Sequence, residues 1–409
     1  YAINDTISKF ILPLFKRSVE NLKYLSGRLT VSYREDLFKT QEILNGLPFI
    51  YRRLFDGTSL ESSELFLGKE EIKSIVNQAK ERFKAKLPSA ILITGAPGSG
   101  KTSYIYYIEK ELLKPGEFIR LDFRERISTV DELRRILSDA LGYNELKTVE
   151  SIIIDLNERF RNKFVLLTNL NKTFIRTVDG FEALKTMLYI ISMTSSNVLW
   201  VATVQSIGWQ FIKTNFKAAS LFNFSVTLEE LNKNKIREII LHRQHTTGFG
   251  YRFTRDDLYL LRKKLFSKSK PVEDQSYLQE VYFERLTEYA DGNIVAGMNY
   301  WLNSISKIEE NTLVIQTYRS FPLIDLSFLD ITMISVLYTV MLHGGIRRNQ
   351  LADSLNISEK MAGEYLEKLL SLNLLRIGEL TKSHDYYYVN KFKFKSIQHE
   401  LKKRNMLPW

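Results

Sequence analysis

The sequence predicts an α/β fold. Its core is a parallel five-stranded sheet in three layers, followed by a helical lid and a C-terminal domain of helices and one hairpin. Short apolar runs alternate with stretches of helical periodicity over residues 66–228, which is typical of strands joined by crossover helices. A glycine-rich segment separates the first apolar run from the helix that follows it. After residue 228 the strand signal is lost and helical periodicity takes over.

Five apolar runs of strand length define the core domain, which we place at residues 66–228. Each run is nearly continuous in apolar residues, as expected for parallel strands that are covered on both faces. The five expected strands span residues 90–94, 117–122, 164–168, 198–203 and 224–228.

Residues 1–65 predict an N-terminal helical arm, because Ile7, Phe10 and Ile11 recur at the spacing of one helix face. The chain begins at Tyr1 with neither a methionine nor a signal-peptide pattern. We therefore expect further residues before it in the native protein.

Two regions follow the core. Residues 229–320 read as a helical lid subdomain, with helices over 231–245, 277–290 and 294–305. Residues 321–409 predict three helices and then a hairpin, the element order of a winged-helix domain. These elements span residues 329–342, 349–355, 358–372, 374–377 and 386–389. The alternation of lysine and phenylalanine over 391–395 predicts a final strand or a basic tail.

Composition excludes several classes of site. The 409 residues include 58 Lys and Arg against 47 Asp and Glu, and the net charge of +11 favours anionic partners. There is no cysteine, which excludes disulfides, thiolate zinc sites and cysteine nucleophiles. The five histidines leave few ligands from which to build a transition-metal centre. The longest apolar run, 331–342, is shorter than the roughly 20 residues that span a bilayer. We therefore expect a cytoplasmic protein without a transmembrane segment.

The glycine-rich segment carries the main functional signal. Residues 95–102 read GAPGSGKT, in which two glycines separated by four residues are followed by Lys and Thr. An apolar strand precedes this segment and a helix follows it, which is the context of a phosphate-binding P-loop. Glycines allow the backbone N–H groups of such a loop to surround phosphate oxygens.

The P-loop predicts ATP or ADP with Mg²⁺ as cofactors. Lys101 is expected to reach the β- and γ-phosphates, and the hydroxyl of Thr102 is expected to be the metal ligand. The residues expected to line the phosphates are Gly95, Ala96, Pro97, Gly98, Ser99, Gly100, Lys101, Thr102 and Ser103.

Residues 66–71, Phe-Leu-Gly-Lys-Glu-Glu, resemble the Gly-Arg-Glu box of certain P-loop ATPases. From residue 45 onward the chain is similar to AAA+ proteins of the origin-initiator type and to signal-transduction ATPases with numerous domains (STAND), as in large bacterial ATP-binding proteins. The resemblance implies that Phe66, Leu67 and Gly68 line an adenine pocket, and that a helical lid and a winged helix follow the core. By its residues alone, the box is also compatible with an ordinary exposed helix start.

The sequence departs from these families at the positions used for hydrolysis. They carry acidic Walker B residues at the end of a strand that we expect beside the P-loop strand, and here Thr168 and Asn169 stand in those positions. Neither residue is a good general base near pH 7. Thr203 or Gln205, at the end of the next strand, is a candidate polar sensor, although either is also compatible with a strand-end residue bonded to backbone.

Two further patterns bear on hydrolysis. Residues 290–296 read ADGNIVA, with Ile and Val where initiator-type proteins offer an arginine to the nucleotide. Other carboxylates, such as Asp155 and Glu158, form no acid–base pair with a strand-end context. We therefore expect no separate hydrolase site.

Together these patterns predict an ATP- or ADP-binding switch with weak or absent intrinsic hydrolysis. It would couple nucleotide state to the arrangement of lid and winged helix, and to a protein partner or self-association. One alternative is a DNA-binding ATPase, initiator- or loader-like, that uses the winged helix and the basic tail. Another is an active ATPase completed by a partner or an oligomer. The helix at 358–372 offers three acids against two lysines, which disfavours DNA, so we favour a protein contact or a clamp on the lid.

Overall fold

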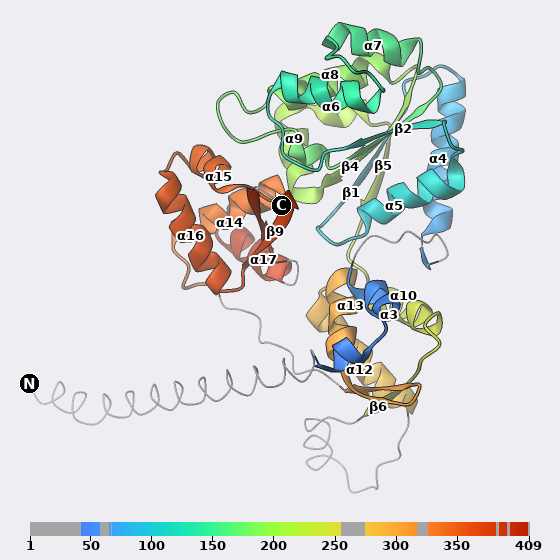
Figure 1. The fold of residues 1–409 in the computed structure, drawn as a ribbon, viewed down its shortest axis with the longest axis vertical. Helices are drawn as coiled ribbons and strands as arrows, with labels where there is room; N and C mark the ends of the chain where they lie inside the picture. Colours follow the sequence, from blue (N-terminus) through green and yellow to red (C-terminus); the bar gives the residue numbers. More distant parts are fainter. Residues whose placement is uncertain are drawn as a thin grey trace, which may run out of the picture.

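The computed structural model describes residues 42–57, 65–66, 68–254, 275–316, 326–381, 384–390 and 393–407. Figure 1 shows a central sheet with its helices, a lid below it and a C-terminal domain beside it. Most of the predicted N-terminal arm lies outside the described residues. In the described part of the chain, no helix is both long enough and apolar enough to cross a membrane.

The core is a parallel five-stranded sheet, as predicted. All of its strand pairs are parallel, and the strand order is β2-β3-β4-β1-β5. Strands β1 and β3 are buried along their whole length, which explains their nearly continuous apolar sequences. The strands are β1 (Ala90–Gly95), β2 (Phe118–Asp122), β3 (Phe164–Thr168), β4 (Leu199–Gln205) and β5 (Phe224–Leu228).

The order of the strands corrects one prediction. The strand next to β1 is β4, and β3 lies one position further out. Ile93 of β1 pairs with Thr203, and Gly95 pairs with Gln205. The expectation that the strand ending in Thr168 lies beside the P-loop strand was therefore wrong, because β4 inserts between them.

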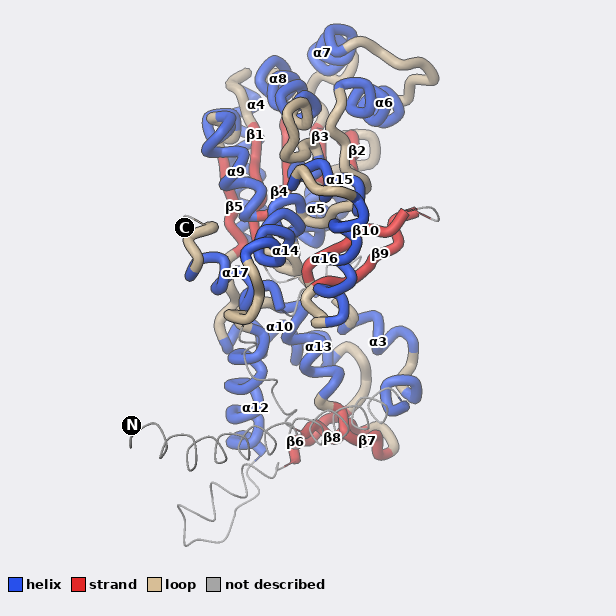
Figure 2. The backbone as a smooth tube through the Cα atoms, turned by 90° about the vertical axis from the view of Figure 1, so that its left-hand side faces the viewer, coloured by secondary structure: helices blue, strands red, loops and turns tan. Residues whose placement is uncertain are grey.

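Helices cover both faces of the sheet (Figure 2). On one face, α4 and α5 pack with Ile93 and Leu166. On the other face, α6, α7, α8 and α9 pack with Leu92 and Leu167, which confirms the three-layer core. These helices are α4 (Lys69–Lys84), α5 (Lys101–Tyr107), α6 (Val130–Ala140), α7 (Val149–Asn157), α8 (Glu182–Thr194) and α9 (Ser206–Phe216), with short turns η3 (Ile108–Leu112), η4 (Leu170–Lys172) and η5 (Ala218–Leu221).

The lid contains strands as well as the expected helices. Its helices are α10 (Lys233–His245), α12 (Gln275–Ala290) and α13 (Ile294–Asn303). A three-stranded sheet in the order β6-β8-β7 adjoins them, so the expectation that this region has no strands was wrong. The strands are β6 (Gly250–Thr254), β7 (Ile305–Glu309) and β8 (Thr312–Gln316).

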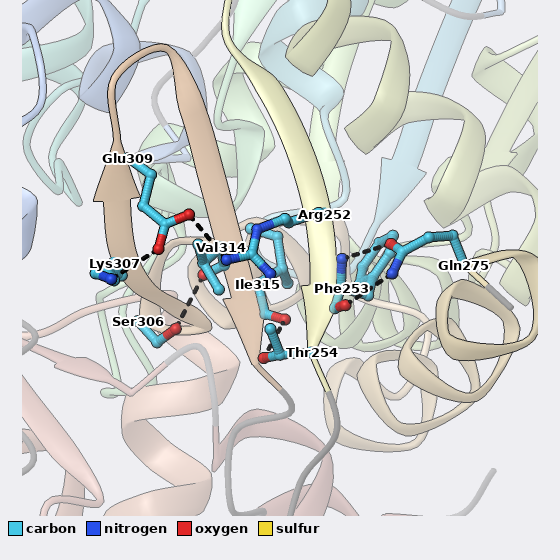
Figure 3. Close-up of polar contacts among 9 residues, drawn as sticks. All are labelled: Arg252, Phe253, Thr254, Gln275, Ser306, Lys307, Glu309, Val314 and Ile315. Carbon is cyan, nitrogen blue, oxygen red and sulfur yellow. Dashed lines mark hydrogen bonds and ion pairs between the residues drawn. The ribbon is translucent and has the colours of Figure 1, made fainter. Parts of the chain in front are cut away.

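Figure 3 shows how this small sheet is held together. Arg252 of β6 and Lys307 of β7 both pair with Glu309, at 2.8 and 2.7 Å. The side-chain amide of Gln275 accepts from the N–H of Phe253 at 2.9 Å and donates to its carbonyl oxygen at 3.0 Å. Gln275 thus occupies the outer edge of β6 in the way that another strand would.

An N-terminal helix, α3 (Phe49–Phe55), packs within the lid and beside α13 (Figure 1). Trp301 Nε1 donates to the hydroxyl of Tyr51 at 3.0 Å, and that hydroxyl donates to Oε1 of Gln244 at 2.8 Å. The domain boundaries drawn from the sequence stay predictions, but this part of the predicted arm belongs to the hydrophobic cluster of the lid.

The C-terminal domain has three helices followed by a two-stranded antiparallel hairpin, in the predicted order. The end of the chain differs from the prediction, because Phe394, Ile397 and Leu401 lie on the buried face of a helix and not on a strand or tail. The Lys-Phe alternation overlaps only the first turn of that helix. The elements are α14 (Ile331–His343), α15 (Arg348–Leu355), α16 (Glu359–Ser371), β9 (Leu375–Thr381), β10 (His384–Val389) and α17 (Phe394–Lys403).

Candidate nucleotide-binding site

The glycine-rich loop joins the end of β1 to the start of α5. Gly98 and Gly100 have φ angles of 81° and 97°, a backbone conformation that residues with a Cβ rarely adopt. A Cβ at Gly98 would also lie 3.0 Å from Oδ1 of Asn293 and 3.2 Å from Cγ2 of Val295. Gly98 is therefore required both by its backbone conformation and by the close approach of the lid.

Lys101 and Ser99 both lie against this loop. Lys101 Nζ donates to the carbonyl oxygens of Gly95 and Ala96, at 2.8 and 2.7 Å. Ser99 Oγ is buried and finds no hydrogen-bond partner among the described residues. A cation and an unpaired hydroxyl at a turn of left-handed glycines are groups that bind phosphate oxygens. The residues present therefore fit a nucleotide phosphate.

Thr102, the second residue of α5, has an exposed side chain. Within the described residues, no group of three or more His, Cys, Asp or Glu side chains is arranged to hold a metal ion. Mg²⁺ is usually held by one or two protein groups together with nucleotide phosphates and water. An accessible hydroxyl beside a phosphate-binding loop fits that mode of binding.

The segment before α4 meets the helix that follows the loop. The ring of Phe66 lies with its centroid 4.7 Å from that of Tyr104 and 4.9 Å from that of Tyr107. A Cβ at Gly68 would lie 2.7 Å from the hydroxyl of Tyr104, and burial raises the pKa of Tyr104 to about 12. Leu67 lies outside the described residues. The two predicted segments therefore adjoin, and Tyr104 joins them.

Sequence reasoning missed Tyr104, although a signal was present. Tyr104 and Tyr107 follow Lys101 by three and six residues, a spacing that places them along one side of a helix.

Thr168 is the last residue of β3, Asn169 follows it, and Thr203 lies within the neighbouring strand β4. The N–H of Asn169 donates to Oγ1 of Thr203 at 3.0 Å, so Thr203 has the backbone contact that its alternative interpretation predicts. Asn169 has a left-handed φ of 61°. The hydroxyl of Thr168 donates to a carboxylate oxygen of Asp122 at the end of β2.

Asp122 is the second residue that sequence reasoning missed. It is a carboxylate at the end of a core strand, and it accepts from the hydroxyl of Thr168. Its position at the end of an expected strand was a signal, but its partner is set by strand pairing, which the sequence does not contain.

The lid contacts the glycine-rich loop directly. Asn293 Nδ2 donates to the carbonyl oxygen of Pro97 at 2.9 Å. Asn293 Oδ1 accepts from the N–H groups of Val295 and Ala296, at 3.0 and 3.3 Å, and so caps the start of α13. Val295, one of the two residues that stand where the sequence resemblance would place an arginine, lies against Gly98.

The C-terminal domain contacts the same edge of the sheet from another side. A Cβ at Gly344, in the turn after α14, would lie 2.6 Å from Nε2 of Gln205. Asn171 accepts from the N–H of Gln205 and donates to the carbonyl oxygen of His343, each at 3.3 Å. Gln205 is the register partner of Gly95, so this turn lies one strand away from the phosphate-binding loop.

Arg126 fixes the same contact from the loop after β2. It is buried, and its guanidinium donates to the carbonyl oxygens of Asn171 and Phe174 in the core. It also donates to the carbonyl oxygens of His343 and Gly345 in the C-terminal domain, the latter at 3.0 Å. Burial lowers the pKa of Arg126 to about 10. The domain therefore docks on the core, whereas a clamp on the lid was one of the two roles that we expected for it.

Comparisons with known proteins gave one family model and several solved structures that this chain is similar to. A family model described as Zeta toxin matches residues 73–150, which include the glycine-rich loop. No curated protein sequence matches the chain. Among solved structures, the chain is similar to the ORC2 protein of Aeropyrum pernix in its ADPNP-ADP complexes, with 15% identity, coverage of 87% of this chain and 99% of that one, and a TM-score of 0.39.

Two other similar structures are a RuvB mutant of Thermotoga maritima and Cdc6p of Pyrobaculum aerophilum. The first shares 15% identity, covers 84% of this chain and 97% of its own, and has a TM-score of 0.39. The second shares 11% identity over 86% and 98% of the two chains, also with a TM-score of 0.39. The parallel sheet and the loop between β1 and α5 make this chain an α/β protein with a P-loop NTPase fold.

Proposed function

We propose that this protein is a nucleotide-dependent switch of the cytoplasm, which binds ATP or ADP with Mg²⁺ between the sheet core and the lid and hydrolyses ATP weakly or not at all. The observation that carries the proposal is the hydrogen bond between Asn293 of the lid and Pro97 of the phosphate-binding loop. Asn293 of the lid is thereby bonded to the loop that would hold the nucleotide phosphates.

The main predicted binding residues have places in this proposal. Lys101 would hold the phosphates together with the loop N–H groups, and Thr102 would hold Mg²⁺. Phe66, Gly68 and Tyr104 would border the base. Mg²⁺, when bound, supplies charge neutralisation for the phosphates.

The contacts of the loop explain how binding would act on the lid. Lys101 Nζ now donates to Gly95 and Ala96, and a bound phosphate would attract it away from those carbonyl oxygens. The loop next to Pro97 would then rearrange, and Asn293 is bonded to that residue. A ligand that favours one arrangement of this contact shifts the population of lid positions.

The strand ends support slow hydrolysis. The side-chain amide of Asn169 donates to the carbonyl oxygen of Phe123 at 3.4 Å. An amide or a hydroxyl at these positions is a poor acceptor for the proton of an attacking water. Binding contacts without transition-state contacts preserve affinity and lower the rate.

The surface of α16 favours a protein partner over DNA. Glu359, Glu364 and Glu367 are all exposed on this helix, and duplex DNA is attracted by basic surfaces. We therefore propose that the C-terminal domain binds a protein partner. Salt-sensitive binding of this chain to duplex DNA would instead show that it binds DNA.

Calorimetric titration with ATP and ADP in the presence of Mg²⁺ tests the proposal. Wild type should bind both nucleotides, and Lys101→Ala should lose binding. Lys110→Ala is the matched control, since Lys110 is an exposed lysine in the turn that continues the same helix, and it should bind as wild type does. Nucleotide binding that is equal in wild type and Lys101→Ala would contradict the proposed site. Rapid phosphate release would contradict slow hydrolysis.

A further inference from the structure

Resting on the nucleotide-binding function above, we propose that Asp122 replaces the carboxylate missing from the end of β3. It would do so by orienting the hydroxyl of Thr168 as an acceptor for a water of the Mg²⁺–nucleotide complex. Asp122 would be a positioning residue, because it acts through Thr168.

Strand pairing places Asp122 and Thr168 at the same level of the sheet. They are register partners at the ends of β2 and β3. Successive side chains of a strand point to opposite faces, and Phe164 and Leu166 of β3 pack in the cluster that includes α5. Thr168, two residues further on, therefore belongs to the face covered by α5.

Asp122 belongs to that face as well. Arg120, two residues earlier on β2, pairs with Glu109 at 2.8 Å and lies over the ring of Tyr106 at 4.8 Å. Glu109 and Tyr106 belong to α5 and to the turn that continues it. The carboxylate thus lies on the face of the sheet that carries the helix beginning at Lys101.

The direction of the hydrogen bond determines what Thr168 can do. A hydroxyl has one proton to donate, and Thr168 donates it to Asp122. Its oxygen is then left as an acceptor, and the carboxylate strengthens that acceptor through the shared hydrogen bond. Waters bound to Mg²⁺ are donors and need acceptors of this kind.

Asp122 also has a second contact, which does not account for its position. Its other carboxylate oxygen lies 3.4 Å from Nε of Arg124, whose side chain is 82% exposed. Such an exposed pair contributes little. Thr168 is buried, while the side chain of Asp122 is 31% exposed, so water and ions can reach the carboxylate.

The test is a calorimetric titration of the ATP complex of the full chain with Mg²⁺. The affinity for ATP is also measured in EDTA, without Mg²⁺. Asp122→Asn should weaken the apparent Mg²⁺ affinity about 10- to 100-fold, as expected for a residue that orients a metal-bound group, and should leave ATP affinity in EDTA unchanged. Thr168→Val should behave in the same way. Asp139→Asn, an exposed acid on α6, is the control of equal charge and should match wild type.

A double variant, Asp122→Asn with Thr168→Asp, moves the carboxylate to the end of β3 and should recover at least part of the Mg²⁺ affinity. A structural role for Asp122 alone would give no such recovery. If Asp122→Asn fails to fold, Thr168→Val carries the test. Mg²⁺ affinity equal to wild type in Asp122→Asn or in Thr168→Val would overturn the inference. Failure of wild type to bind ATP would instead refute the proposed function.

Discussion

His343 lies fully buried where the C-terminal domain meets the core. Its Nε2 accepts from the N–H of Arg176 at 3.1 Å, and its Nδ1 lies 2.7 Å from the carbonyl oxygen of Thr339. These partners require one ring nitrogen to accept and the other to donate, which is the neutral form. Burial, together with Arg126 and Arg176, holds the pKa of His343 well below its usual value of 6.5.

This histidine predicts a loss of stability in acid. Below about pH 6.5 the unfolded chain binds a proton that folded His343 does not, so the free energy of unfolding should fall by up to about 1.4 kcal/mol per pH unit. Above that pH the contribution of His343 is constant. Denaturant unfolding between about pH 7.5 and pH 5 should show a smaller loss for His343→Gln than for wild type. His399→Gln, at an exposed position, should keep the wild-type loss, and equal losses in all three proteins would refute the assignment.

Tyr51 predicts a stability effect within the lid. Replacing it with Phe leaves the indole N–H of Trp301 and Oε1 of Gln244 without the partner that each has now. Buried polar groups left unpaired cost about 1–3 kcal/mol each, so Tyr51→Phe, which leaves two such groups, should lower the free energy of unfolding by about 2–6 kcal/mol. Tyr189→Phe removes an exposed hydroxyl and should change it little. Urea titration that gives both variants the same midpoint would contradict the account.

The turn after α14 packs closely against the core where the C-terminal domain docks. Gly344 has a φ of 66°, and a Cβ there would lie 2.6 Å from Gln205 and 2.8 Å from Nδ2 of Asn171. Gly142 has a comparable φ of 77°, but a Cβ there would meet no described atom within 4 Å. Alanine would therefore cause similar backbone strain at both positions, but only at Gly344 would its side chain also collide with the core.

Alanine at the two positions should have different effects. Gly142→Ala should cost only the backbone strain, roughly 1 kcal/mol, whereas Gly344→Ala should cost more and loosen the docked domain. Limited proteolysis should cut the C-terminal domain of Gly344→Ala faster than that of Gly142→Ala. The same rate of cutting in both variants would show that the turn does not hold the domain.

The cap of α13 predicts a link between helix and nucleotide. Asn293 caps α13 and bonds Pro97, while Asn232 caps α10 by accepting from the N–H of Lys235 at 3.0 Å. Each Asn→Ala change should cost about 1 kcal/mol. Only Asn293→Ala should also alter ATP affinity, measured by calorimetry. If ATP affinity changes equally in both variants, the contact between Asn293 and Pro97 has no specific effect on nucleotide binding, and the prediction is wrong.

Strands could be predicted from the sequence where both of their faces are buried. Strands β1 and β3 are buried throughout, so their sequences are apolar and easily recognised. The lid strands are five residues long and carry exposed charges such as Arg252 and Lys307. Their stability comes from pairing with β8 and from Gln275, and neither contact leaves a local pattern.

Only part of the candidate site could be predicted from the sequence. The P-loop is a continuous segment whose glycine positions follow from its own conformation, so the sequence alone located it. Asp122 and Gln205 depend on which strands are neighbours, and strand order is a property of the folded sheet. Their places beside Thr168 and Gly95 therefore required the structure.

The lid and the C-terminal domain are joined to the core in different ways. Buried residues of α14 and α17 belong to the same hydrophobic cluster as those of α8 and α9. The lid has a cluster of its own, which includes α3. Separating a shared apolar cluster exposes its surface to water, whereas the lid meets the loop through Asn293 and Val295. We therefore expect the lid to move first when nucleotide binds.

Hydrogen exchange at the start of α13 measures whether a bound nucleotide moves the lid. Amides 295–297, next to Asn293, should exchange at a rate that depends on whether ATP with Mg²⁺, ADP or no nucleotide is present. In Lys101→Ala the rate should be the same under all three conditions, and amides in α14 should change less than those in α13. If exchange at α13 in wild type is unaffected by either nucleotide while calorimetry shows binding, the protein binds nucleotide without acting as a switch of the lid.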